Sequence, residues 1–222
     1  MRTVIFDLDG TLADTSADLI AAANACFRSL GHGDVLDPAR DALTAFHGGR
    51  AMLRLGFTRL TSQAPDETEV NEQYPALLAH YGANIATHTR AYPGAVAAVQ
   101  ALRDAGFAVG ICTNKPAGLA EQLLSEMGIR NLFASLVGAD TLPVRKPDPA
   151  PYVAAVARAG GTLTRSMLIG DTETDRRTAA AAGVPVALVT FGPEGRAIER
   201  LAPEALLDSY DDLPGLADRL LA

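Results

Sequence analysis

Residues 4–14 read VIFDLDGTLAD, an apolar run that ends in closely spaced acidic residues. Three apolar residues run directly into Asp7, and Asp9 follows two positions later, before Gly10 and Thr11. Unpaired charge at the end of a buried strand is unfavourable in free energy. The two carboxylates are therefore either ordinary turn and helix-cap residues, or ligands for a cation and a phosphate.

The bulk composition indicates a globular protein with a sizeable core. The chain has 222 residues, of which 48% are hydrophobic and 20% charged. A net charge of −7 and a pI near 5.0 argue against nucleic acid and against an anionic membrane surface as partners. No apolar run reaches the length of about 18 residues that a transmembrane helix needs.

The termini and cysteines favour a cytoplasmic protein. The apolar stretch before Asp7 is only three residues long, too short for a signal peptide. Cys26 and Cys112 are isolated thiols outside any CxxC pattern, which suits a reducing compartment. We expect both cysteines to lie in the core or in helices, and the protein to be a monomer or homodimer.

The hydrophobic pattern differs between two parts of the chain. Residues 15–84 carry helical periodicity and no strand-like alternation, with helices predicted over 16–30, 38–54 and 66–82. From Tyr92 onward, short apolar runs alternate with helix-like segments. The runs are 107–112, 134–139, 167–170 and 184–190, and the helices are 95–105, 116–128, 150–159, 174–182 and 213–221.

This alternation is typical of parallel strands buried on both faces. With the opening strand included, it predicts a doubly wound, Rossmann-like α/β sheet of about five parallel strands. The α/β core should comprise residues 1–14 and 85–222, with a helical domain over residues 15–84 inserted after the first strand.

Polar residues gather at the predicted strand ends, where open parallel sheets bind ligands. They are Asp7 and Asp9, Thr113 and Asn114, Lys146 in the loop after the third strand, and Asp171 and Asp175 after the fourth. Each alone could be a helix cap or a solvated loop residue. Four such sets on one rim indicate Mg²⁺, which prefers oxygen ligands, together with a phosphate.

The lysines point to the same rim. The chain has two lysines, Lys115 and Lys146, against seventeen arginines, and both lie in predicted strand-end loops. Lysine is a compact point charge that approaches a phosphate or carboxylate without the planar fork of arginine.

The motifs DLDGTLADT, TNKP, RKPDP and GDTETD, in this order and spacing, resemble the haloacid dehalogenase-like hydrolases. The match is closest to the phosphoglycolate phosphatase-like group, which carries a helical cap. The resemblance implies Asp7 as nucleophile and Asp9 as general acid and base. It implies that Thr113 and Lys146 hold the phosphoryl group, with Gly10 and Asn114 beside the substrate, and that Asp7, the Asp9 carbonyl and Asp171 bind Mg²⁺ with support from Asp175.

These roles predict a Mg²⁺-dependent phosphatase of a small phosphate monoester, acting through an aspartyl-phosphate. A sugar-phosphate mutase shares every core residue and stays open as an alternative. A response-regulator receiver lacks a helical insert, and a dehalogenase has no need of Mg²⁺. A phosphonate-cleaving relative needs a cap lysine, and residues 15–84 contain none.

The segment Phe46–Arg50 resembles the glycine-bearing cap segment of the same group. Its members His47, Gly48, Gly49 and Arg50 are candidate substrate-binding residues, because adjacent glycines permit close backbone approach and an arginine can hold a carboxylate bidentately. Arg54 lies one helical turn further on, so either arginine could be the contact. The alternative is an interhelical turn with a solvated arginine.

Overall fold

A computed structural model describes residues 1–222 of the chain as two compact units. The first, here called the α/β unit, comprises Met1–Ala13 and Ala91–Ala222. The second, the helical unit, comprises Asp14–Arg90. The two units join after residues 13 and 90, whereas the sequence analysis placed the boundaries after residues 14 and 84.

The α/β unit is built on a parallel sheet of six strands in the order β5-β4-β1-β6-β7-β8. Its centre is β1, which pairs in parallel with β4 and β6, so that Val4 lies beside Val109 and Met167. The strands are β1 (Thr3–Phe6), β4 (Ala108–Cys112), β5 (Ser135–Val137), β6 (Ser166–Gly170), β7 (Val186–Val189) and β8 (Ala205–Leu207). The doubly wound parallel fold is confirmed.

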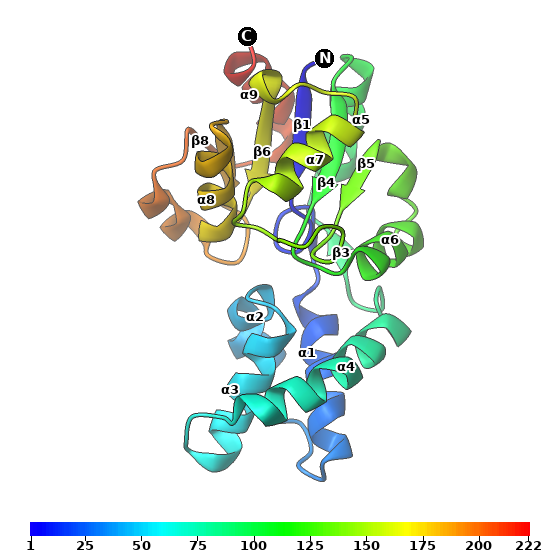
Figure 1. The fold of residues 1–222 in the computed structure, drawn as a ribbon, viewed down its shortest axis with the longest axis vertical. Helices are drawn as coiled ribbons and strands as arrows, with labels where there is room; N and C mark the ends of the chain where they lie inside the picture. Colours follow the sequence, from blue (N-terminus) through cyan, green and yellow to red (C-terminus); the bar gives the residue numbers. More distant parts are fainter. The chain divides into compact units, whose positions relative to one another are not determined.

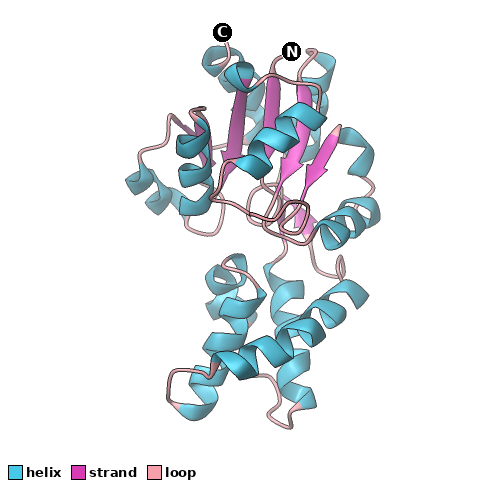
Figure 2. Ribbon diagram, viewed as in Figure 1, coloured by secondary structure: helices cyan, strands magenta, loops and turns pink.

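Helices cover the sheet, as Figures 1 and 2 show. The contacting pair α7 (Ala150–Arg158) and α8 (Glu173–Ala182) packs on the central strands, and its apolar side chains join those of the sheet in one core. A second contacting pair is α5 (Ala95–Asp104) with α9 (Leu213–Leu220), while α6 (Ala117–Glu126) packs beside β5. Burial on both faces explains why these strands read as continuous apolar runs.

The sheet has six strands, one more than the approximately five that were predicted. The sixth, β8, has three residues, two of them only partly buried, and lies at the sheet edge. So short an edge strand has neither an alternating pattern nor a fully buried run to reveal it. The 3₁₀ segments η1 (Arg130–Leu132), η2 (Leu163–Arg165), η3 (Gly195–Leu201) and η4 (Tyr210–Asp212) complete the unit.

The helical unit consists of α1 (Ser16–Ser29), α2 (Pro38–Phe46), α3 (Gly49–Thr61) and α4 (Glu67–Ala83). Helix α1 packs against the other three. The single helix predicted over 38–54 is wrong, because the chain breaks between α2 and α3 at Gly48, whose φ of +92° belongs to the region that favours glycine.

Two short strands mark the passages between the units. The outgoing chain forms β2 (Ala13–Asp14) and the returning chain forms β3 (Arg90–Ala91), and the two pair as a separate two-stranded sheet. Directly after β3, the Tyr92 N–H donates to the Leu12 carbonyl over 3.0 Å. No helix of the structure combines the length and apolar character needed to cross a membrane.

Candidate active site

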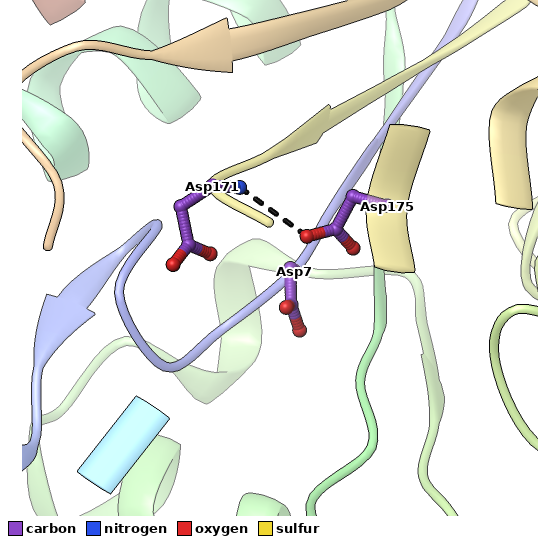
Figure 3. A group of neighbouring side chains, drawn as sticks. All are labelled: Asp7, Asp171 and Asp175. Atoms are coloured by element: carbon purple, nitrogen blue, oxygen red, sulfur yellow. Dashed lines mark hydrogen bonds between the residues drawn. The ribbon is translucent and has the colours of Figure 1, made fainter. Parts of the chain in front are cut away.

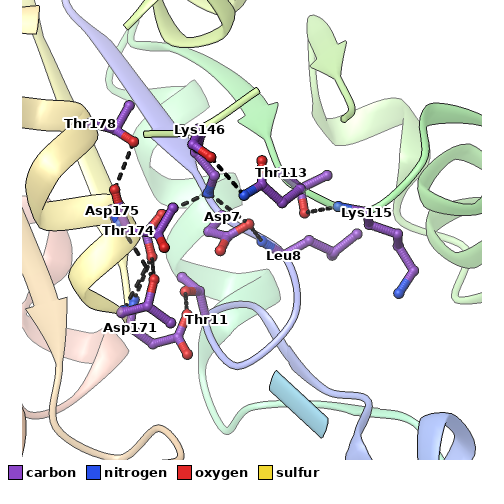
Figure 4. A network of polar contacts seen from close by, with 12 residues as sticks. Asp7, Leu8, Thr11, Thr113, Lys115, Lys146, Asp171, Thr174, Asp175 and Thr178 are labelled. Atoms are coloured by element: carbon purple, nitrogen blue, oxygen red, sulfur yellow. Dashed lines mark hydrogen bonds and ion pairs between the residues drawn. The ribbon is translucent and has the colours of Figure 1, made fainter. Parts of the chain in front are cut away.

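The predicted core residues meet at the carboxyl edge of the sheet. Asp7 follows β1, Thr113 follows β4, Asp171 follows β6, and Asp175 lies in the first turn of α8. Lys146 comes from the loop between β5 and α7, and all five side chains are buried. Figure 4 shows them converging from these elements. Parallel strands end at one edge, so residues far apart in sequence share one site.

Three buried carboxylates form the centre of the site (Figure 3). One oxygen from each of Asp7, Asp171 and Asp175 lies within 4.8 Å of the others. Burial, opposed by Lys146 and assisted by Asp175 and Asp9, raises the pKa of Asp7 to about 6. Burial and then the neighbouring Asp175 and Asp7 raise the pKa of Asp171 well above its usual value. Such a cluster favours the arrival of positive charge.

Lys146 supplies part of that charge. Its side chain is 1% exposed, and its Nζ lies 2.6 Å from Asp175 Oδ1 and 3.1 Å from Asp7 Oδ1. Burial works to lower the pKa of Lys146, but Asp175 and Asp7 outweigh it and the pKa is raised. The ammonium is therefore a fixed positive charge, not the solvated loop residue that a lysine before proline usually is.

Asp175 and Asp171 have different hydrogen-bond environments. Asp175 Oδ1 accepts from Lys146, and its Oδ2 accepts from the backbone of Asp171 and from Thr172, with which it forms the capping box of α8. Asp171 Oδ1 accepts from Thr11 Oγ1 over 2.7 Å. Asp171 Oδ2 is buried without any hydrogen-bond partner.

This unpartnered oxygen fits a metal site. A buried carboxylate oxygen without a partner is costly unless something charged meets it. Asp171 Oδ2 belongs to an all-oxygen donor set shared with Asp7, which suits a hard divalent cation. Asp171 could therefore hold a cation directly, while Asp175 is engaged by Lys146 and by the start of α8.

The two carboxylate oxygens of Asp7 differ in their contacts: Oδ1 has two partners, and Oδ2 accepts no hydrogen bond from the chain. The Leu8 N–H donates to Oδ1 over 2.8 Å, and Lys146 pairs with that same oxygen. The carboxylate is oriented through Oδ1 in this way. Oriented side chains lose less entropy when they react.

The loop after β4 carries two predicted residues, Thr113 and Asn114, and connects to the loop that holds Lys146. Thr113 Oγ1 accepts from the Lys115 N–H over 3.1 Å, and Asn114 Nδ2 donates to the Lys146 carbonyl over 3.0 Å. Neither side chain caps α6, whose first N–H, that of Ala117, is bound by Asp140. The Asn114 contact fixes the loop that presents Lys146.

The loop after β1 holds Asp9 and Gly10. Gly10 has a φ of +82°, and its N–H donates to the Ala13 carbonyl over 2.9 Å, so the turn needs glycine. Asp9 is partly exposed, and its Oδ1 lies 2.8 Å from Lys115 Nζ.

Several supporting residues escaped the sequence analysis. Thr11 belongs to the quoted DLDGT stretch and could have been found there. Tyr210, whose hydroxyl donates to the Thr11 carbonyl over 2.7 Å, lies beyond the strand that was missed. At Gly192 a Cβ would lie 2.9 Å from the Gly10 carbonyl oxygen, so a side chain there would press on the same loop. A lone tyrosine or glycine carries no sequence signal for such contacts.

The four remaining candidates, His47, Gly48, Gly49 and Arg50, lie in the helical unit and are described within it. His47 is exposed and ends α2, while Gly49 packs so closely on α4 that a Cβ would lie 2.8 Å from Leu77. The Arg50 guanidinium lies 4.0 Å from the ring centre of Tyr74 and donates to Asn71, both neutral partners.

Arg54, by contrast, makes a bidentate ion pair with Glu67, at 2.6 and 2.8 Å. Arg50 has no ion pair with any carboxylate of the chain. Of the two arginines, Arg50 therefore makes no direct ion pair, although Glu67 also interacts with its charge.

Comparison with known proteins shows the family to which the chain belongs. Residues 4–189 match the family model described as haloacid dehalogenase-like hydrolase. A phosphoglycolate phosphatase of Cereibacter sphaeroides is 40% identical over the full length of both chains. One from Caulobacter vibrioides is 37% identical over 99% of this chain and 92% of its own.

Solved structures share the fold. A predicted phosphoglycolate phosphatase from Haemophilus somnus superposes with a TM-score of 0.84 at 24% identity, covering 97% of both chains. CbbY from Rhodobacter sphaeroides, in complex with phosphate, superposes with a TM-score of 0.76 at 24% identity, covering 96% of both.

Proposed function

Because the chain belongs to the haloacid dehalogenase-like hydrolase family, we propose that it is a Mg²⁺-dependent phosphatase of a small phosphate monoester, acting through an aspartyl-phosphate. The observation that carries the proposal is the buried cluster of Asp7, Asp171 and Asp175 around Lys146, with Asp171 Oδ2 left unpartnered. Nothing in a purely structural role accounts for three carboxylates buried around one lysine.

In the first step Asp7 attacks the phosphorus atom of the substrate. The bond from phosphorus to the ester oxygen breaks, and the departing alkoxide takes a proton from the Asp9 carboxyl group. Lys146 and the Thr113 hydroxyl stabilise the charge on the phosphoryl oxygens, where phosphoryl transfer is chiefly catalysed.

In the second step water attacks the phosphorus of the aspartyl-phosphate. Asp9, now a carboxylate, takes a proton from that water, and the bond between Asp7 and phosphorus breaks to release inorganic phosphate. Both carboxyl groups then return to their starting state. Asp7, Asp171 and the Asp9 carbonyl would hold Mg²⁺, which when bound neutralises the carboxylates and the phosphoryl oxygens.

We propose that the helical unit is the cap domain that selects the substrate. Its break at residues 47–50 offers backbone groups and Arg50, which makes no direct ion pair with a carboxylate. An arginine of this kind suits a carboxylate or second phosphate on the substrate. A small anionic phosphate ester is therefore the first candidate, and phosphoglycolate is the natural one to try, since the Cereibacter relative bears that name.

The composition also bears on the partners and the cellular location of the protein. The net charge of −7 disfavours nucleic acid and anionic membranes as partners, and the two cysteines are free and buried. We propose a cytoplasmic enzyme acting on small molecules as a monomer or homodimer.

The direct test is a panel of small phosphate monoesters, with phosphoglycolate and hexose phosphates included. Phosphate release should occur with Mg²⁺, stop with a chelator and return when Mg²⁺ is restored. Chromatography of the products distinguishes the alternative, because a sugar-phosphate mutase yields an isomer with little free phosphate. Release that is unchanged in chelator would contradict metal dependence.

A further inference from the structure

Lys115 is a buried lysine that the proposed chemistry does not use. It is one of two lysines in the chain, and its side chain is 4% exposed. Its Nζ lies 2.8 Å from Oδ1 of Asp9, which is 106 residues away in sequence. Figure 4 shows that Lys146 extends toward Asp7, whereas the Lys115 side chain extends away from it. The two lysines thus serve different carboxylates.

The backbone of Lys115 is fixed on both sides. Its N–H donates to Thr113 Oγ1 over 3.1 Å, and its carbonyl accepts from the Ala139 N–H over 3.0 Å. At Gly138 a Cβ would lie 2.8 Å from that carbonyl oxygen, so the loops after β4 and β5 approach closely. The backbone of Lys115 is therefore held in place, so that its ammonium group can fix the position of a carboxylate that pairs with it.

We propose that Lys115 is the positioning residue for Asp9, holding its carboxyl group at the place from which it exchanges protons with the leaving oxygen and the attacking water. The inference rests on the proposed function, in which Asp9 is the general acid and base. Asp9 lies on a loop and is partly exposed, so its side chain needs an external partner to stay in one rotamer. Proton transfer requires hydrogen-bond reach, and a displaced carboxyl group loses that geometry.

The test is a double-mutant cycle of Lys115→Met and Asp9→Asn, with kcat/KM measured on an alkyl phosphate and on nitrophenyl phosphate. Lys115→Met should lower kcat/KM on the alkyl phosphate by about tenfold or more, and much less on the aryl ester, whose leaving group needs no proton. Added to Asp9→Asn, it should cause no further loss, because it acts through Asp9. Lys115→Arg should recover part of the activity.

Controls separate this effect from damage to the fold. Arg130→Met breaks an ion pair with Glu121 in which both side chains are partly exposed, and it should leave the activity on both substrates unaffected. Equal losses on both esters, losses that multiply with Asp9→Asn, or a rise only in KM would overturn the proposal, the last indicating substrate contact instead.

A crystal structure of Lys115→Met gives a readout that is independent of turnover. The Asp9 side chain should leave its rotamer in that variant and keep it in Lys115→Arg. An unmoved Asp9 would refute the positioning role even if the phosphatase proposal holds. Failure of the phosphatase proposal would show separately, as no phosphate release from the unsubstituted protein.

Discussion

Each carboxylate of the site has its own set of partners, and these partners assign the roles. Asp7 is oriented through one oxygen and keeps the other without a hydrogen bond. Asp175 has both oxygens engaged by Lys146 and by the start of α8. Asp171 keeps a buried oxygen without a partner. The stretch GDTETD contains three acids, and the hydrogen bonds distinguish Asp171, which keeps an unpartnered buried oxygen, from Asp175, whose two oxygens are both engaged.

Asp171→Asn should therefore change mainly the Mg²⁺ requirement, whereas Asp175→Asn should change mainly the stability of the fold. Asp171→Asn removes an uncompensated buried charge, so stability should stay within about 1 kcal/mol while the Mg²⁺ concentration for half-maximal activity rises more than about 100-fold. Asp175→Asn leaves Lys146 with one partner fewer and should cost about 3 kcal/mol of unfolding free energy. Urea denaturation and Mg²⁺ titration measure the two effects.

The reverse pattern would contradict the assignment. If Asp171→Asn left the Mg²⁺ requirement unchanged, Asp171 would be only part of the loop before α8. A loss of stability confined to Asp171→Asn would mean that its carboxylate is satisfied in solution.

Arg50 and Arg54 form a second pair of residues that the structure distinguishes. Arg50→Ala should lower kcat/KM for a carboxylate-bearing phosphate ester by about tenfold or more and leave nitrophenyl phosphate nearly unchanged, because the aryl ester lacks the group being bound. Arg54→Ala is the matched control, since its charge is already compensated by Glu67. Parallel losses on both esters would indicate a general defect of the helical unit. No loss in Arg50→Ala would make Arg50 a surface residue.

At the scale of elements, the turn after β1 is held by the far end of the chain. Tyr210 in η4 donates to Thr11, and Thr11 donates to Asp171. The Tyr210 ring also packs on Phe191 at 5.1 Å between ring centres, and Phe191 packs on Tyr92 at 5.3 Å. The segments after β3, β7 and β8 thereby support one face of the site loop.

Tyr210→Phe keeps the ring and removes one buried hydrogen bond. Unfolding free energy should fall by about 1–2 kcal/mol, since the Thr11 carbonyl loses its donor. The Mg²⁺ concentration for half-maximal activity should rise, because Thr11 orients Asp171. Tyr152→Phe is a matched control: its buried hydroxyl donates to Ser166, so stability should fall similarly without any change in the Mg²⁺ requirement. Equal Mg²⁺ effects in both variants would refute a link through Thr11.

Sequence patterns predicted the elements that are buried and regular. The central strands are fully buried, so apolar runs such as Met167–Gly170 reveal them. The half-buried β8 and the 3₁₀ segments lack such a pattern. The break at Gly48 was foreseen only as an alternative: one helix was predicted over 38–54, although the paired glycines also allowed an interhelical turn there. The core site residues were found because parallel strands must end at one edge.

Contacts between distant side chains could not be predicted in the same way. The pairing of Lys115 with Asp9 and of Tyr210 with Thr11 depends on rotamers and on loop approach, neither of which has a sequence period. The scarcity of lysine in the chain indicated that Lys115 lies near the site, but it did not predict Asp9 as its partner. No comparable signal pointed to Tyr210.

At the scale of the whole molecule, one chain builds the α/β unit from two separated segments. The opening residues supply the central strand and Asp7, and the segment from Ala91 onward supplies the other strands and residues of the site. The site is thus complete only when the N-terminal strand pairs between β4 and β6. The proposed activity therefore depends on the chemistry of that first strand end.

The most direct test is the rate of phosphate release by Asp7→Asn at saturating Mg²⁺ and substrate. Asparagine keeps the shape and can keep the hydrogen bond from Leu8, so circular dichroism should show a folded protein. Turnover should fall by several orders of magnitude because the attacking oxygen is lost, and the Asp7 peptide should no longer gain a phosphoryl group in acid-quenched samples. A folded Asp7→Asn protein that releases phosphate at a rate near that of the unsubstituted enzyme would contradict the account.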